Sequence, residues 1–148
     1  MTAVRASIDL PAPPEDVWDL IMDPHQMERW VTIHRELLWV DEGAPGPGFE
    51  MSQRFSIRGA PVTVTWVIDE FDPPRRATWN GVGPAGATAF IEYRLEESPL
   101  GTTFHYTNDF RPPMGILGRV ASRALMGGVP EREAEASLHA LRTLFASG

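Results

Sequence analysis

Most of the chain alternates between apolar and polar residues, which is the pattern of strands with one buried and one exposed face. The alternation is clear at residues 3–10, 49–57, 62–71, 87–96 and 102–110, and shorter β-compatible segments occupy residues 36–40 and 77–82. Clusters of proline and glycine separate these segments and are typical of tight turns. The pattern therefore predicts seven strands, and the short connections favour antiparallel neighbours.

Two short helices are predicted directly after the first strand. Pro14, followed by Glu15 and Asp16, suits a first helical turn, because proline has a preset φ and acids favour the positive end of the helix dipole. Asp23 and Pro24 fit the N-cap and first position of the second helix, which ends before the β-branched residues 31–33. The side chains expected to face inward from these helices are Val17, Trp18, Ile21, Met27 and Trp30.

A long amphipathic helix is predicted over residues 112–148. Its expected buried stripe consists of Ile116, Val120, Ala124, Gly127, Ala134, Leu138, Leu141 and Phe145, which recur every three or four residues. Charged residues, Glu133 among them, fall on the side assigned to solvent. The sequence GGVP at residues 127–130 interrupts the stripe, and Pro130 predicts either a kink or a break at which a second helix begins. A phase continued through Gly127 places Glu131 on the covered side.

These elements predict an α+β fold in which one strongly curved antiparallel sheet is covered on one face by the long helix. With 148 residues, the chain suits a single domain that buries its own core. The small residues in the middle of the helix stripe leave room between the helix and the sheet. We therefore expect an enclosed cavity between these two layers.

Four stretches, together with this order of elements, carry a resemblance to a known superfamily. They are residues 8–18 (IDLPAPPEDVW), 27–30 (MERW), 72–75 (DPPR) and 101–104 (GTTF). Over essentially its whole length the chain resembles the helix-grip or SRPBCC superfamily, which includes START lipid-transfer domains, birch-pollen-allergen-type proteins and bacterial polyketide cyclase/dehydrase-like proteins. The resemblance implies a cavity that holds a lipid, sterol, polyketide, quinone or similar molecule. It supplies no catalytic motif common to all members.

Composition narrows the range of partners and locations. The chain has no cysteine, which excludes disulfides and thiolate chemistry and fits a reducing cytoplasm. Its net charge of -7 and pI near 5.0 argue against binding to nucleic acid or to anionic lipid surfaces. No segment has the apolar length of a signal peptide or a membrane span. We therefore expect a soluble cytoplasmic protein that binds a hydrophobic small molecule, while its oligomeric state stays open.

Strand alternation and helix phase select the residues expected to line the cavity. They are Met51, Gln53, Phe55, Val64, Trp66, Trp79, Ile91, Tyr93, Phe104, Tyr106, Asn108, Gly127 and Glu131. Most are apolar, and for any one of them a place in the plain core is favoured over contact with a ligand, because a sheet face under a helix is first of all a core. The polar members Gln53, Tyr93, Tyr106 and Asn108 need hydrogen-bond partners when buried, and one another, water or a ligand oxygen would meet that need.

Tyr106 and Glu131 are the candidates for acid–base chemistry. In a cyclase, Tyr106 would donate to a substrate carbonyl while Glu131, its pKa raised by burial, takes or returns a proton. The alternative, that Glu131 is an exposed acid in the first turn after Pro130, is favoured, because acids are preferred at that position. No two of the four histidines, which are His25, His34, His105 and His139, have the spacing of metal ligands. No metal or other cofactor is therefore expected, and His34 is placed at the surface or near a pocket mouth.

Three functions are compatible with these features. The first is binding or transport of a hydrophobic or amphipathic small molecule, and the second is a polyketide cyclase or dehydratase that uses tyrosine and glutamate. The third is a protein-interaction module related to the co-chaperone branch of the same fold, which would use an exposed apolar patch. Binding is favoured, because the expected cavity is rich in aromatic residues and poor in titratable groups.

Overall fold

The computed structural model describes residues 3–111 and 128–146. Its element order is β1 (Val4–Leu10), α1 (Pro14–Ile21), the 3₁₀ helix η1 (Pro24–Arg29), β2 (His34–Val40), β3 (Glu50–Ile57), β4 (Ala60–Asp72), β5 (Arg76–Val82), the 3₁₀ helix η2 (Pro84–Gly86), β6 (Thr88–Glu97), β7 (Thr102–Arg111) and α3 (Val129–Ala146). The seven predicted strands are confirmed, and their ends differ from the prediction by at most two residues.

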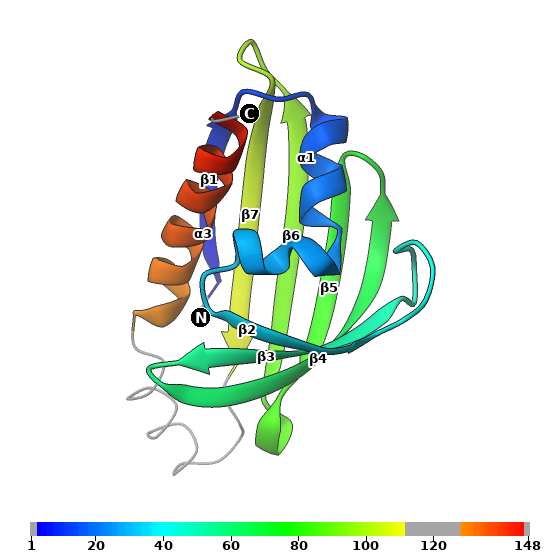
Figure 1. Ribbon diagram of the computed structural model, residues 1–148, viewed down its shortest axis with the longest axis vertical. Coiled ribbons are helices and arrows are strands. Elements are labelled where there is room, and N and C mark those ends of the chain that lie inside the picture. Colours follow the sequence, from blue (N-terminus) through cyan, green and yellow to red (C-terminus); the bar gives the residue numbers. More distant parts are fainter. Residues whose placement is uncertain (1–2, 112–127, 147–148) are drawn as a thin grey trace.

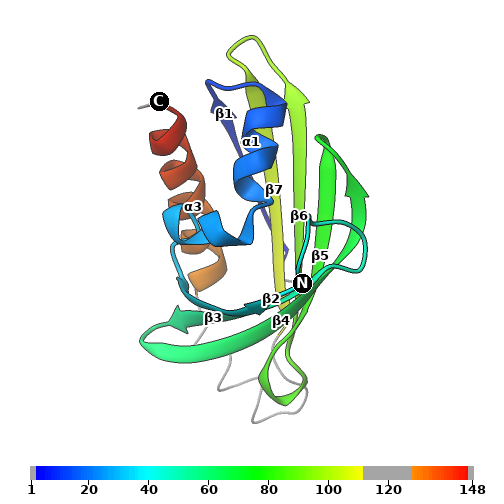
Figure 2. The same ribbon diagram turned by 45° about the vertical axis from the view of Figure 1, so that its right-hand side comes forward.

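The strands form one antiparallel sheet in the order β1-β7-β6-β5-β4-β3-β2. Consecutive strands from β2 to β7 are neighbours, and β1 completes the sheet by pairing with β7, with Ile8 opposite Phe104. The sheet curves so strongly that β2, β3 and β4 run across the lower ends of β5, β6 and β7 (Figures 1 and 2). A register shift between Ile68 and Phe71 of β4 adds to this curvature, because a bulge bends the strand that carries it.

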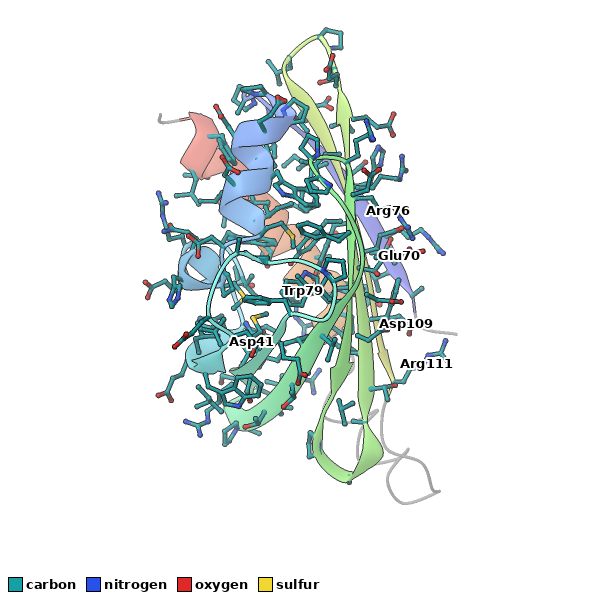
Figure 3. The ribbon with its side chains drawn as sticks, turned by 90° about the vertical axis from the view of Figure 1, so that its right-hand side faces the viewer. Asp41, Glu70, Arg76, Trp79, Asp109 and Arg111 are labelled. Carbon is teal, nitrogen blue, oxygen red and sulfur yellow. The ribbon has the colours of Figure 1, made fainter. Side chains whose placement is uncertain are left out.

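Helices α1, η1 and α3 cover the concave face of the sheet, and α3 packs along β1 and β7 (Figures 1 and 2). This is the predicted α+β fold of the helix-grip type. The predicted starts of the early helices are confirmed, since α1 begins at Pro14 and the Asp23 side chain caps η1 by accepting from the backbone N–H of His25 at 3.0 Å. The charged side chains of Glu70 and Arg76 project from the opposite face (Figure 3), where Arg76 forms ion pairs with Glu70 and Glu92.

The predicted interruption of the C-terminal helix is a break and not a kink. Helix α3 begins at Val129, and Gly128 before it has a φ of +75°, a left-handed conformation that cannot continue a right-handed helix. Pro130 therefore stands in the first turn, where its missing N–H leaves no hydrogen bond unmade. The earlier part of the predicted helix, Gly127 included, lies outside the described residues.

The break corrects the predicted orientation of two acidic side chains. Glu131, expected on the covered side, is exposed, whereas Glu133, expected in solvent, is only 3% exposed. The prediction failed because it carried the helix phase through residue 127, although α3 begins only at Val129. The buried positions of α3 are Val129, Glu133, Ala134, Ser137, Leu138 and Leu141.

Candidate functional site

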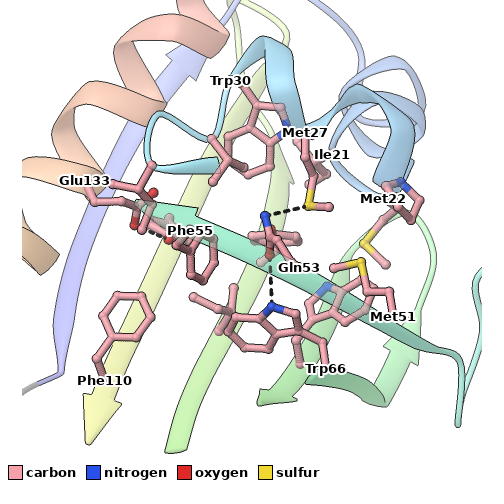
Figure 4. Close-up of a pocket in the computed structure, with 17 residues that line it drawn as sticks. Ile21, Met22, Met27, Trp30, Met51, Gln53, Phe55, Trp66, Phe110 and Glu133 are labelled. Carbon is pink, nitrogen blue, oxygen red and sulfur yellow. Dashed lines mark hydrogen bonds between the residues drawn. The ribbon is translucent and has the colours of Figure 1, made fainter. Parts of the chain in front are cut away.

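A cavity lies between the concave face of the sheet and the helices that cover it (Figure 4). Its volume is about 40 Å³, which is room for roughly three water molecules at about 10–15 Å³ each. The residues that line it are Ile21, Met22, Pro24, Met27, Trp30, Val31, Ile33, Met51, Gln53, Phe55, Trp66, Trp79, Ile91, Tyr93, Tyr106, Phe110 and Glu133. The predicted cavity therefore exists, but side chains fill most of the space between the layers.

Eight of the residues predicted from the sequence contribute to this lining: Met51, Gln53, Phe55, Trp66, Trp79, Ile91, Tyr93 and Tyr106. They come from β3, β4, β5, β6 and β7, and strand alternation is what brings them to one face. Val64, Phe104 and Asn108 are buried but do not line the cavity. Glu131 is exposed, which confirms the favoured alternative for this residue and contradicts its placement in the cavity lining.

The prediction missed the contribution of the first two helices and the segment after them. Ile21, Met22, Pro24, Met27, Trp30, Val31 and Ile33 all line the cavity, and Phe110 and Glu133 complete it. The inward-facing positions of Ile21, Met27 and Trp30 were visible in the sequence. What the sequence did not show is that η1 lies close enough to the sheet for these side chains to fill the cavity.

Glu133 is the buried carboxylate of this site. Its Oε1 accepts hydrogen bonds from the Tyr106 hydroxyl at 2.6 Å and from Asn108 Nδ2 at 3.1 Å, and its Oε2 accepts from the Ser137 hydroxyl at 2.6 Å. Ser137 Oγ in turn accepts from the backbone N–H of Thr32 at 3.3 Å. The network therefore joins α3 to β7 and to the segment that follows η1.

Burial changes the acidity of this group of side chains. Removal from water raises the pKa of Glu133, and the hydrogen bonds from Ser137, Tyr106 and Asn108 oppose that rise only in part. Burial, followed by the nearby negative charge of Glu133, also raises the pKa values of Tyr93 and Tyr106. Glu133 therefore keeps its proton to a higher pH than an exposed carboxyl, which is a property of general acids and bases.

A second polar chain runs through Gln53. The indole N–H of Trp66 donates to Gln53 Oε1 at 3.0 Å, and Gln53 Nε2 lies 3.4 Å from the Met27 sulfur (Figure 4). Gln53 Nε2 also lies 2.7 Å from Nδ1 of His34. Because an indole can only donate, the amide oxygen faces Trp66 and the amide N–H₂ faces His34. Nδ1 of His34 is therefore the acceptor, and its proton is on Nε2.

His34 is half-buried, and this burial lowers its pKa. Protonation of Nδ1 would set two donors against each other at Gln53, which also favours the neutral ring. The other histidines lie away from the cavity lining. His139 is exposed on α3, and Nε2 of His105 lies 2.9 Å from Glu96 on the outer face of the sheet.

An open groove of about 490 Å³ lies next to the cavity. It is lined by Trp18, Asp19, Met22, Asp23, Pro24, His25, Val40, Asp41, Gly43, Ala44, Pro45, Phe49 and Phe71. Met22 and Pro24 line both spaces, so these two residues form the boundary between the groove and the cavity.

Two further properties concern the described part of the chain. Among residues 3–111 and 128–146, no group of three or more histidine, aspartate or glutamate side chains is placed to hold a metal ion. No helix in these two segments is long and apolar enough to cross a membrane.

Comparison with known families places this fold and cavity in context. Residues 1–146 match the family model described as polyketide cyclase / dehydrase and lipid transport. The chain belongs to this family. Membership supports a role in ligand binding or cyclisation, without distinguishing between the two.

The chain is also similar to two proteins of Mycobacterium tuberculosis. It is 26% identical over 150 residues to a protein named Toxin Rv0910, with 99% of each chain covered. It is 27% identical over 133 residues to the uncharacterized protein Rv1546, which covers 87% of this chain and 92% of the relative.

Solved structures share the fold at lower identity. The Zhui aromatase/cyclase from Streptomyces sp. R1128 superposes with a TM-score of 0.79 at 20% identity, covering 97% of this chain and 93% of that one. An uncharacterized protein from Rhizobium leguminosarum has a TM-score of 0.71 at 15% identity, covering 99% and 95%. These similarities establish the architecture.

Proposed function

We propose that the chain is a single ligand-binding domain whose cavity takes up a hydrophobic or amphipathic small molecule. The observation that carries this proposal is the lining, in which aromatic and aliphatic side chains surround a few polar groups placed at defined positions. That combination is typical of sites that bind small organic molecules. Family membership supports the same class of ligand.

The small volume of the cavity requires that a ligand displace side chains. Met22, Met27 and Met51 all line it, and methionine adapts its shape more readily than other apolar residues because its side chain is unbranched and flexible. Movement of Met22 would join the cavity to the open groove, whose volume alone lies within the ~300–1,000 Å³ range of ligand sites. We infer that ligands enter through the groove and pass Met22.

Native mass spectrometry of the gently purified protein tests this proposal. A stoichiometric passenger released on denaturation would identify the ligand class. Affinity for that passenger should be abolished in Trp79→Ala, because Trp79 lines the cavity, and unchanged in Trp39→Ala, because Trp39 is 46% exposed on β2. Equal affinity of both variants would contradict the proposal.

A cyclase or dehydratase is the second candidate, and one observation favours it. Glu133 and Tyr106 both line the cavity and are hydrogen-bonded to each other, and burial raises the pKa of Glu133. This is the tyrosine–carboxylate pair that such chemistry needs, with Glu133 in the place predicted for Glu131. If the protein turns over a linear poly-β-ketone, Glu133→Gln and Tyr106→Phe should lose turnover but still bind the compound. Undiminished turnover in both variants would rule the pair out.

The interaction module predicted as a third function needs a contiguous exposed apolar patch. Among the described residues, the exposed large apolar side chains are Leu38 and Trp39 on β2, Val82 at the end of β5 and Leu100 in the turn between β6 and β7. The end of β5 and the turn between β6 and β7 lie at opposite ends of the sheet (Figure 1). This function stays a prediction without a supporting surface.

A further inference from the structure

Two tryptophans of the cavity have buried indole N–H groups without a hydrogen-bond partner. Trp30 is 2% exposed and Trp79 is 4% exposed, and neither Nε1 has an acceptor among the described residues. Trp66, which lines the same cavity, differs because its N–H donates to Gln53. Buried polar groups are nearly always paired, so two unpaired donors in one cavity call for an explanation.

The two donors come from different walls of the cavity. Trp30 is the C-cap residue of η1, and its ring packs against Tyr93 and Phe104 at centroid distances of 5.8 and 6.4 Å. Trp79 lies in β5 on the concave face, with the ring of Phe49 6.3 Å away in an edge-to-face arrangement. These aromatic contacts restrict the rotation of both rings, so the N–H groups cannot readily turn toward other acceptors.

The chemistry of these donors restricts what they can bind. An indole N–H donates and never accepts, so each requires an acceptor atom. Three other polar groups of the lining have partners within the protein: the Gln53 amide bonds to Trp66, and the Tyr106 hydroxyl bonds to the Glu133 carboxylate. Among the described residues, the buried side-chain atoms of the lining that lack partners are the two indole nitrogens.

We propose that Trp30 and Trp79 recognise an oxygen acceptor, such as a ketone or quinone carbonyl, on the apolar ligand of this cavity. This inference rests on the proposed function and specifies its ligand class. A hydrocarbon of the same shape would leave both donors buried and unpaired, and sites that hydrogen-bond a ligand discriminate strongly against analogues that lack the bonding group. Water can satisfy both donors in the empty cavity, and the carbonyl would replace it.

The experiment compares acetophenone with α-methylstyrene, which have equal numbers of non-hydrogen atoms and differ in C=O against C=CH₂. Titration calorimetry gives both affinities, and ¹H–¹⁵N spectra follow the indole N–H signals. The ketone should bind roughly tenfold more tightly, the effect of one to two net hydrogen bonds. It should shift the indole N–H signals of Trp30 and Trp79, whereas the signal of the exposed Trp39 should not move.

The double variant Trp30→Phe/Trp79→Phe removes both donors, and Trp66→Phe is the control for the smaller ring. The ratio of the two affinities should fall to about one in the double variant and persist in Trp66→Phe, because a ratio cancels losses due to shape alone. Equal binding of both compounds to the wild type, or a ketone preference that survives in the double variant, would overturn the inference but leave the proposed function intact. Binding of neither compound would count against both.

Discussion

Replacing Glu133 by alanine tests the carboxylate network that joins α3 to the sheet. The substitution removes the acceptor of three donors, namely the Tyr106 hydroxyl, the Ser137 hydroxyl and Asn108 Nδ2. Asn108 keeps a hydrogen bond to the carbonyl oxygen of Pro130 at 3.2 Å, whereas the two hydroxyls lose the carboxylate that accepts from them. The variant therefore has two buried donors that must find new partners.

The expected cost follows from these two donors. Each buried donor without a partner costs about 1–3 kcal/mol of stability. Removing the desolvated charge of Glu133 offsets part of the total cost of the two donors. We expect Glu133→Ala to lower the free energy of unfolding by about 3 kcal/mol at neutral pH. For a chain of this length, such a loss lowers the melting temperature by roughly 6–12 °C.

Two further variants distinguish the loss of the hydrogen-bond network from the effect of changing an acidic residue on α3. In Glu133→Gln the amide oxygen can accept from Tyr106 and Asn108, while the amide N–H₂ donates to the Ser137 oxygen, so stability should stay within about 1 kcal/mol of the wild type. Glu131→Ala removes an exposed acid two positions earlier on the same helix. It should change stability by no more than about 0.5 kcal/mol.

The raised pKa of Glu133 also fixes how this residue affects stability as pH changes. When the folded-state pKa of an acid lies above its unfolded value of 4.5, the folded protein holds the proton that the unfolded chain has released. The contribution of Glu133 to stability is therefore greatest below pH 4.5 and falls as pH rises toward the folded-state pKa. Relative to Glu133→Gln, the wild type should lose stability as pH rises above 4.5.

Urea unfolding followed by tryptophan fluorescence measures all three variants, and repeating it between pH 4 and 8 gives the pH dependence. A loss below about 1 kcal/mol in Glu133→Ala would refute the network as a stabilising element. A difference between wild type and Glu133→Gln that grows in favour of the wild type with rising pH would refute the assigned direction of the pKa shift.

Three other predictions address the remaining parts of the site. Tyr106→Phe removes a hydrogen bond that lowers the pKa of Glu133, so that pKa should rise further, and the free energy of unfolding in urea should fall by about 1–2 kcal/mol. Ligand affinity measured by calorimetry should stay within about threefold of the wild type. A larger loss of affinity would give Tyr106 a binding role. Burial lowers the pKa of His34 below 6.5, so the stability of the wild type should fall relative to His34→Gln as pH drops below 6.5. The control is His139→Gln, which changes an exposed histidine. A stability difference between the wild type and His34→Gln that does not change with pH would contradict the buried neutral tautomer. Met22→Ala should raise the association rate of the ligand at least about threefold in stopped-flow fluorescence, because a smaller side chain at the boundary between groove and cavity removes a slow step. An unchanged rate would place the entrance elsewhere.

The seven strands, and the buried face of those with a clear alternation, could be predicted from the sequence alone. Alternation places Met51, Gln53 and Phe55 on one side of β3 because successive residues of a strand point to opposite faces. Proline and glycine clusters marked the turns, and Pro14 and Asp23 marked the helix starts, because these residues restrict the local backbone. Such features depend on neighbours in the chain, so they can be identified without the fold.

The tertiary structure decided which acid is buried, how large the cavity is and which polar groups pair. Glu133 is buried in place of Glu131 because α3 begins at Val129, and two positions along a helix turn a side chain by more than half a circle. The cavity is small because η1 brings Met27 and Trp30 against the sheet, and the pairing of His34 with Gln53 joins residues from two strands. These outcomes depend on how separate elements dock, and docking is set by contacts between residues that are distant along the chain.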